Sequence, residues 1–489
     1  MQFSTIPTTL MRHDTPAMID HRLSEMEVTE AFRDAIVIET GCDIGHSDIN
    51  TDFSDLGLDP LAAINVLNTV TNRTGIELPA SLFRDCKTLS DIAKHLGQKQ
   101  GISASTSATR QLSSQAEQPV RDAFLELSSY ERKFAEEAGF ANFWTAVYPA
   151  ERRLVLSFVY KAFSDLGCAL DRVKAGQKVP CPQGILDKHR RVFDGALFEI
   201  LEDGGIVSKS PAGYIRTPTP IDTTPSEDIY KDLVRDHPPF AKVHELLHAT
   251  GSRFAECLSG KTDPIKLLFG KNKDLLQHFY TDAPMCLAAS LHLAALIRRV
   301  YTRRARGNDE CIEILEVGAG MGGTTKFVID ALVEANVRFK YVFTDISSSF
   351  FAAAKRRFGD IAPGSMECLV LDIEKEPPEP LQRRFDLVIS TNCIHATKSL
   401  VTSCSNVHKL LRPGGFFALI EFTTRFYWLD LVFGLLDGWW LFEDGRKHCT
   451  VNGPSWKTNL EASGFSHVLW TEAEGIEKPN PQLLVAYTD

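Results

Sequence analysis

Apolar and polar positions follow two different patterns along this chain, and the pattern changes near residue 311. From about residue 120 to 300 the apolar positions recur mainly at helical spacing, whereas the later part contains short apolar runs, each followed by a helical or loop segment. These runs are CIEILEVG (311–318), FKYVFTDI (339–346), ECLVLDI (367–373), FDLVISTN (385–392) and GFFALIEF (415–422). Strands that alternate with helices are typical of a doubly wound parallel sheet. We therefore expect an α/β core at residues 301–489, preceded by a mainly helical subdomain at residues 120–300.

The N-terminal part divides into three predicted segments. Residues 1–22 are expected to form a disordered leader. Helical spacing at 27–41, 65–75 and 90–97 predicts a small helical bundle over residues 23–97. Residues 98–119 are rich in Ser, Gln, Thr and Ala and predict a flexible linker.

One part of the helical subdomain departs from its pattern. A predicted helix at 189–203 precedes two short β-like runs within 204–217. This arrangement resembles a winged-helix element, which we interpret as a packing module rather than a DNA-binding one.

Composition and charge restrict the function. The chain has 489 residues and a net charge of −10, which argues against a nucleic-acid partner because phosphate binding favours a basic face. Its eleven cysteines lack CxxC spacing, as expected for reduced thiols in a cytoplasmic protein. The most apolar run, 426–442, contains Asp430 and Asp437 and is short for a membrane span. We expect it to be a buried or cleft-lining helix and expect no membrane association.

A glycine-rich turn with acidic neighbours predicts a cofactor site. The first strand runs into Glu316-x-Gly318-x-Gly320-x-Gly322, where glycines allow the backbone to approach a nucleoside closely. NAD(P)-binding proteins share such a turn, but Glu316 suits a cationic ligand better than a pyrophosphate. Acidic residues also end the next two strands, at Asp345 and Asp372.

This spacing resembles that of class I S-adenosylmethionine (SAM)-dependent methyltransferases. The resemblance implies that Asp345 holds the ribose hydroxyls and that Asp372 contacts the adenine amino group. We also assign Ile373 and Asn392 to the SAM site, and no residues to a metal. The alternative is that the acids are ordinary turn residues.

A histidine and a glutamate follow two strands that should be neighbours. His395 lies just past the fourth strand, and Glu421 ends the fifth. Parallel neighbours lie about 5 Å apart, so their carboxyl ends should bring imidazole and carboxylate together. A carboxylate fixes the histidine tautomer and raises its basicity, which suits a general base. A histidine after a strand can also be merely structural.

The combination ILEVGAGMGGTT, YVFTDIS, STNCIHAT, LLRPGGFFALIEFT and GWWLFEDGRKH resembles the C-methyltransferase domain of fungal non-reducing polyketide synthases. The resemblance covers about residues 120–489 and implies a lid around DPIKLLFG and LLQHFYTDAP. It also implies that His395, oriented by Glu421, deprotonates a carbon between two carbonyls of a polyketide. Tyr280 and Trp440 are weaker candidates for shaping the substrate pocket, and either could be a core aromatic.

The segment from FSDLGLDPLAA onward resembles a small four-helix acyl carrier domain. Pro60 stands where the phosphopantetheine-bearing serine would be, and Ser54 is no convincing substitute. Proline is tolerated in the first turn of a helix, so the fold should survive. We expect the enzyme to methylate a polyketide held on another protein's carrier, or a released one. Its own carrier-like domain would serve docking or stability, or be a relic.

Two other functions remain as alternatives, and one motif is rejected. The same residues could support O-methylation of a phenolic product, or the chain could be a non-catalytic partner of a synthase. HELLH at 244–248 matches the HExxH pattern of zinc proteases, but position 254 is Phe254 and no third ligand is evident. We interpret that segment as an amphipathic helix.

Overall fold

The computed structural model describes residues 119–488, apart from 305–310, 362–364 and 473–476, together with residues 82–100 and short stretches between 29 and 74. Two compact units are present, residues 1–111 and residues 112–489. The predicted leader, Ser54, Pro60 and most of the predicted linker lie outside the described residues.

Most of the described residues of the smaller unit are helical. Helices α3 (Leu82–Asp85) and α4 (Leu89–Gln100) pack with helical residues at 31–36, 66–67 and 69–71 around a core that includes Phe32, Val66 and Ile92. A reciprocal cap begins α4, because Thr88 Oγ1 accepts from the Asp91 amide and Asp91 Oδ2 accepts from the Thr88 amide. The helix runs on to Gln100, so its last residues lie within the segment predicted as a linker from residue 98.

A seven-stranded sheet forms the centre of the larger unit, in the order β5-β4-β3-β6-β7-β9-β8. The five predicted strands are present and parallel: β3 (Ile312–Val317), β4 (Phe339–Asp345), β5 (Met366–Val370), β6 (Phe385–Thr391) and β7 (Leu411–Glu421). Two strands that the sequence analysis missed, β9 (Gln482–Tyr487) and β8 (His467–Trp470), extend the sheet in antiparallel fashion.

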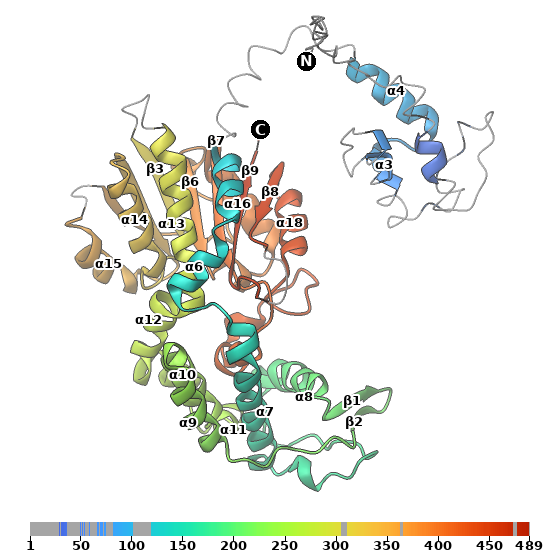
Figure 1. Cartoon of the computed structure of the whole chain (residues 1–489), viewed down its shortest axis with the longest axis vertical. Helices are drawn as coiled ribbons and strands as arrows, with labels where there is room; N and C mark the ends of the chain where they lie inside the picture. Colours follow the sequence, from blue (N-terminus) through green and yellow to red (C-terminus); the bar gives the residue numbers. More distant parts are fainter. Residues whose placement is uncertain are drawn as a thin grey trace, which may run out of the picture. The chain divides into compact units, whose positions relative to one another are not determined.

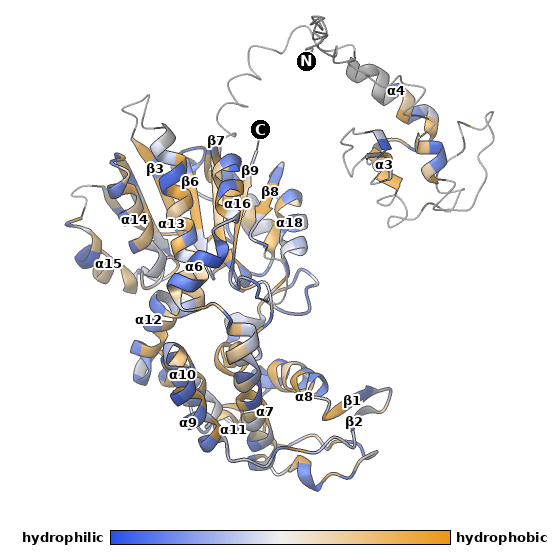
Figure 2. Ribbon diagram, in the orientation of Figure 1, coloured by the Kyte–Doolittle hydropathy of each residue, from blue (hydrophilic) through white to orange (hydrophobic). Residues whose placement is uncertain are grey.

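Helices cover both faces of this sheet (Figure 1). On one face, α13 (Pro284–Arg304) and α14 (Gly323–Glu334) pack on strand residues such as Ile314 and Ile389. On the other, α16 (Leu400–Leu410) and α18 (Gly453–Ala462) pack on Leu315 and Val388. Successive residues of a strand point to opposite faces of the sheet, and both faces are covered by helices, so both sets of residues are apolar. The strands stand out as hydrophobic in Figure 2.

The helical subdomain gathers at one end of the sheet (Figure 1). Its helices are α7 (Tyr148–Asp165), α8 (Phe198–Asp203), α9 (Ser226–Asp236), α10 (Ala241–Gly251), α11 (Phe254–Leu258) and α12 (Lys273–Asp282). The short helix α6 (Glu131–Ala138) packs against α13. Strands β1 (Val207–Ser210) and β2 (Gly213–Arg216) form the predicted hairpin, preceded by a π-helical turn (Val192–Leu197) and α8 rather than by one helix.

The apolar run 426–442 joins the helical subdomain to the core. It forms α17 (Tyr427–Val432) followed by 3₁₀ turns at Phe433–Leu435 and Asp437–Trp440, so the expected single helix is wrong. Its buried side chains, Trp428 among them, belong to the same hydrophobic cluster as α7 and α10. The prediction that the run is buried is therefore correct for most of its residues.

Among the described helices, none alone has the length and apolar character of a membrane span. Helices α12 and α13 meet those two criteria only when taken together, and they are bent by 43°.

Candidate active site

The glycine turn after β3 opens into a cavity of about 390 Å³. It lies at the carboxyl edge of the sheet where β3 is flanked by β4 and β6, the point at which the strand order reverses. Gly318 has a φ of +65°, and a Cβ there would lie 2.2 Å from Cys393 Sγ. Only glycine therefore allows the loops after β3 and β6 to approach this closely.

Most of the predicted cofactor residues line this cavity. They are Glu316, Gly318, Gly320, Asp345, Asp372, Ile373 and Asn392. Gly322 does not line it. That residue caps α14 with a φ of +72°, and a Cβ there would lie 2.7 Å from the Phe358 ring. Gly322 thus allows the tight turn into α14 rather than forming the cavity wall.

Backbone amides hold the carboxylates of Asp345 and Asp372 in place. Asp345 Oδ2 accepts from the Gly320 amide at 3.0 Å, and its Oδ1 accepts from the Ser347 amide at 2.9 Å. Asp372 accepts from the Glu374 amide at 3.1 Å and pairs with Lys375, while its side chain remains 35% exposed. Both carboxylates are fixed at the cavity wall, where they can accept hydrogen bonds from a ligand.

Glu316 is more deeply buried than its position in the sequence suggests. Its Oε2 accepts from the Thr325 and Tyr341 hydroxyls, both at 2.6 Å. Burial raises the pKa of this carboxyl to about 7, against the opposing effect of those two hydrogen bonds. Near neutral pH the Glu316 carboxyl is therefore only partly charged, so its attraction for a cation is weaker than we expected from the sequence.

Asn392 supplies an unsatisfied polar group at the cavity wall. Its φ is +48°, and its backbone amide donates to the Ile420 carbonyl at 2.8 Å. Both polar atoms of its side chain are buried without a hydrogen-bond partner among the described residues. An unpaired buried amide is costly, so a polar ligand in the cavity would relieve that cost. The acidic, glycine and amide groups together fit an adenosine-bearing cation such as SAM.

His395 and Glu421 meet beside this cavity, as the strand register requires. Strands β6 and β7 are parallel neighbours. His395 Nδ1 donates to Glu421 Oε2 at 2.6 Å, and Glu421 Oε1 accepts from the backbone amides of Cys393 and His395, each at 3.2 Å. Glu421 is fully buried and His395 is 8% exposed. Three hydrogen bonds therefore fix the carboxylate that orients the imidazole.

Residues from distant segments complete the surroundings of His395. The Trp439 ring lies edge-on to the imidazole at 5.5 Å between centroids, and Arg446 Nη1 donates to the His395 carbonyl at 3.0 Å. Trp439 Nε1 in turn donates to the buried carboxylate of Asp430 at 2.9 Å. The sequence analysis gave none of the three a site role, although Trp439 and Arg446 lie in the motif GWWLFEDGRKH and Asp430 lies in the apolar run.

The two predicted substrate residues occupy different places. Tyr280 lines the cavity, and burial raises the pKa of its phenol well above its usual value. Trp440 does not line it. Its neighbour Leu441 does, whereas Trp440 lines a separate, smaller pocket and donates from Nε1 to the Gly434 carbonyl.

The histidines of the HELLH segment face different carboxylates. His244 is buried and lies 3.2 Å from Glu151 Oε2, while His248 Nε2 lies 2.9 Å from Glu227 Oε2. Within the described ranges, no group of three or more potential ligands is arranged to hold a metal ion.

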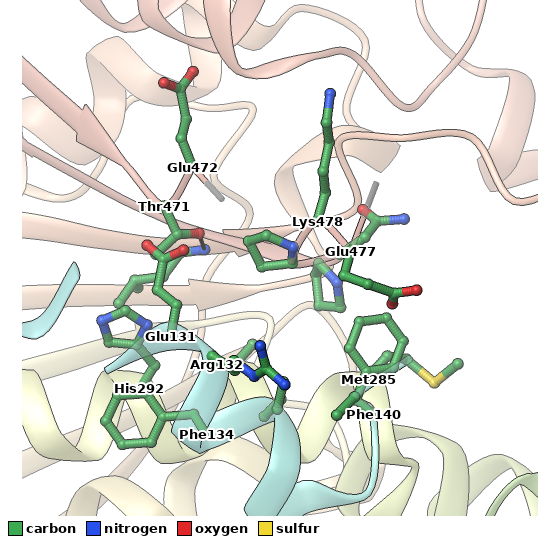
Figure 3. Close-up of a pocket in the computed structure, with 18 of the residues that line it drawn as sticks. Glu131, Arg132, Phe134, Phe140, Met285, His292, Thr471, Glu472, Glu477 and Lys478 are labelled. Carbon is green, nitrogen blue, oxygen red and sulfur yellow. Dashed lines mark hydrogen bonds between the residues drawn. The ribbon is translucent and has the colours of Figure 1, made fainter. Parts of the chain in front are cut away.

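A larger cavity of about 440 Å³ lies between α6, α13 and the loop before β9. Figure 3 shows Phe134 and His292 side by side on its wall. The centroids of their stacked rings lie 4.8 Å apart. Burial raises the pKa of Glu131 to about 7 and lowers that of His292 to about 4. None of the predicted site residues lines this cavity. The smaller cavity at the glycine turn is thus the candidate active site.

Comparison with known families and structures agrees with this geometry. Family models match a phosphopantetheine attachment site (residues 30–96), a methyltransferase helix-turn-helix domain (126–214) and a methyltransferase domain (315–417). The polyketide methyltransferase ustM of Ustilaginoidea virens is 54% identical over 95% of this chain and all of its own length. The non-reducing polyketide synthase pkbA of Emericella nidulans is 38% identical over 91% of this chain, which spans 18% of that synthase.

Solved structures give the same result. The citrinin polyketide synthase CMeT domain matches with a TM-score of 0.72 and 33% identity, over 76% of this chain and 97% of that one. The CurJ carbon methyltransferase matches with a TM-score of 0.66 and 26% identity, over 76% and 99%. Fold and cavity therefore define a class I SAM-dependent methyltransferase, with SAM as its cofactor. The chain belongs to the polyketide methyltransferase family, as the sequence motifs predicted.

Proposed function

We propose that this chain methylates the acidic carbon between two carbonyls of a β-keto polyketide intermediate. The observation that carries the proposal is the buried His395–Glu421 pair beside the cofactor cavity. SAM supplies the methyl group when bound, and Asp345, Asp372 and Asn392 are the residues that would hold it.

The geometry gives His395 the role of general base. Since Nδ1 carries the proton donated to Glu421, the lone pair of the neutral imidazole lies on Nε2. Nε2 removes the proton from the substrate carbon, and the buried carboxylate stabilises the imidazolium that results. The acidic carbon becomes an enolate, which is the nucleophile for methylation.

We further propose that the substrate arrives on a carrier other than the chain's own carrier-like unit. Pro60 offers no hydroxyl for a phosphopantetheine arm, although residues 30–96 match the attachment-site family. The names of the related synthases support a polyketide as the substrate class.

The test is a mass-spectrometric assay of the purified protein with SAM and a small β-keto thioester, with His395→Ala beside it. We expect one methyl on carbon, lost in the variant, while SAM binding by calorimetry is retained. Methyl transfer to a phenolic oxygen but not to carbon would replace this proposal with O-methylation. SAM binding without transfer to free or carrier-bound substrates would point to a non-catalytic partner.

A further inference from the structure

A small basic pocket lies on the other side of the segment that borders the cofactor cavity. Leu441 lines the cofactor cavity, whereas its neighbours Trp440 and Phe442 line a second pocket of about 220 Å³. The helical subdomain contributes Arg191 and Glu199 to this pocket, and the core contributes Arg425, Lys447 and His448. We call these five residues together with Trp440 the basic pocket.

Positive charge dominates the basic pocket. Among the described residues, neither Arg191 nor Lys447 pairs with a carboxylate; Arg191 instead donates to the Trp440 carbonyl and lies over the Phe442 ring at 5.7 Å. Glu199 is the acidic member, and it is already paired with Arg425 Nη1. The pocket therefore carries an excess of cations over acids.

Arg425 and His448 are fixed from behind by one buried acid. Asp430 accepts from Arg425 Nε and from His448 Nε2, both at 2.8 Å. Arg425 Nη2 is buried with no acceptor among the described residues. A buried guanidinium N–H without an acceptor is unfavourable, so Arg425 retains hydrogen-bonding capacity beyond its two carboxylate partners.

A short chain of rings connects the basic pocket to the proposed base. His448 lies 5.8 Å from both the Trp440 and the Trp439 rings, and Trp439 lies 5.5 Å from His395. One indole therefore separates the pocket from the imidazole that would deprotonate the substrate. A molecule held in the pocket by one end could place its other end near His395.

We propose that the basic pocket binds the phosphate group of the phosphopantetheine arm that presents the substrate. This inference rests on the proposed function. Pockets for whole small molecules usually measure about 300–1,000 Å³, whereas one water takes up about 30 Å³. The basic pocket, at about 220 Å³, lies below the range for whole small molecules, so it suits one end of a substrate rather than the whole of it. Arginine forks and a lysine are the side chains that recognise phosphate.

Two substrates that differ only in this phosphate test the proposal: a β-ketoacyl pantetheine and the matching β-ketoacyl 4′-phosphopantetheine. We expect the natural protein to prefer the phosphorylated arm in kcat/KM. Lys447→Ala should reduce that preference roughly tenfold, the effect of losing about 1.4 kcal/mol from one charge-assisted hydrogen bond. Lys447→Arg should largely restore it, and Lys457→Ala, an exposed lysine on α18, should leave it unchanged.

The phosphate could belong to a carrier protein or to coenzyme A. The same variants assayed with acyl-carrier and acyl-coenzyme A identify the source, because the loss follows the arm that uses the pocket. Equal turnover of the two pantetheine substrates by the natural protein would overturn the proposal while leaving carbon methylation intact. Calorimetry with 4′-phosphopantetheine and pantetheine alone tests binding even if methyl transfer fails, and equal affinities would then reject the pocket.

Discussion

Replacing Glu421 with glutamine should convert His395 into the wrong tautomer without changing the shape of the site. Two backbone amides, those of Cys393 and His395, donate to Glu421 Oε1. In Glu421→Gln they would hold the amide oxygen in that position. The amide NH₂ would then face His395 Nδ1, where the carboxylate Oε2 now accepts at 2.6 Å.

That NH₂ group cannot accept a hydrogen bond, so the proton moves from Nδ1 to Nε2. The nitrogen that should receive the substrate proton is then already protonated. When the acid of a serine-protease triad is replaced by its amide, the same change in tautomer costs about 10⁴ in kcat. We expect a loss of about 10³–10⁴ here, which corresponds to about 4–5.5 kcal/mol in the activation barrier.

Single-turnover methyl transfer measures the loss, and calorimetry with SAM checks that the cofactor site is intact. Glu461→Gln, an exposed glutamate on α18, serves as the matched control and should retain full activity. A loss below tenfold in Glu421→Gln would refute the tautomer argument. Detection by nitrogen NMR of a proton on His395 Nδ1 in the variant would refute it as well.

Three further predictions follow from the same structure. Gly318→Ala should weaken SAM binding more than tenfold and lower the melting temperature, because the new Cβ would lie 2.2 Å from Cys393 Sγ. The control Gly438→Ala, whose new Cβ would have no atom within 4 Å, should change neither the SAM affinity nor the melting temperature. SAM affinity should rise between pH 6 and 8, because the Glu316 carboxyl, with its pKa raised to about 7, is neutral below that range and attracts a cation above it. If the same pH dependence persists in Glu316→Gln, another group is responsible for it. Removing residues 1–111 should slow turnover of carrier-bound substrate more than that of a free thioester, and equal slowing would count against a docking role for the smaller unit.

The parallel part of the fold was predictable because burial on both faces makes each strand a continuous apolar run. In β3 and β6 that run ends abruptly, at Gly318 and at Asn392, so strand ends and site residues were found together. Strands β8 and β9 gave weaker signals. β8 has four residues and begins with the exposed His467, and a short apolar run does not reveal its strand partner.

The site was predictable only as far as strand ends determine it. His395 lies just past β6 and Glu421 ends the parallel neighbour β7, so topology alone brings them together. Arg446 reaches the His395 carbonyl from 51 positions further along the chain, and Trp439 packs on the imidazole from a short 3₁₀ turn. Trp440 lines a pocket separate from the cofactor cavity, whereas its neighbour Trp439 packs on the imidazole, since adjacent residues in a 3₁₀ turn point in different directions.

The hydrophobic cluster shared between the helical subdomain and α17 has a consequence for protein engineering. Trp428 packs edge-on against Phe279 of α12, and Phe426 packs against Phe143, although both partners precede the sheet in sequence. The segment that begins directly after Glu421 therefore completes a core whose other half comes from residues 140–286. A chimaera that exchanges residues 120–300 alone would therefore combine parts of one hydrophobic core from two different proteins. To transfer substrate specificity between relatives, residues 422–449 should be exchanged together with residues 120–300.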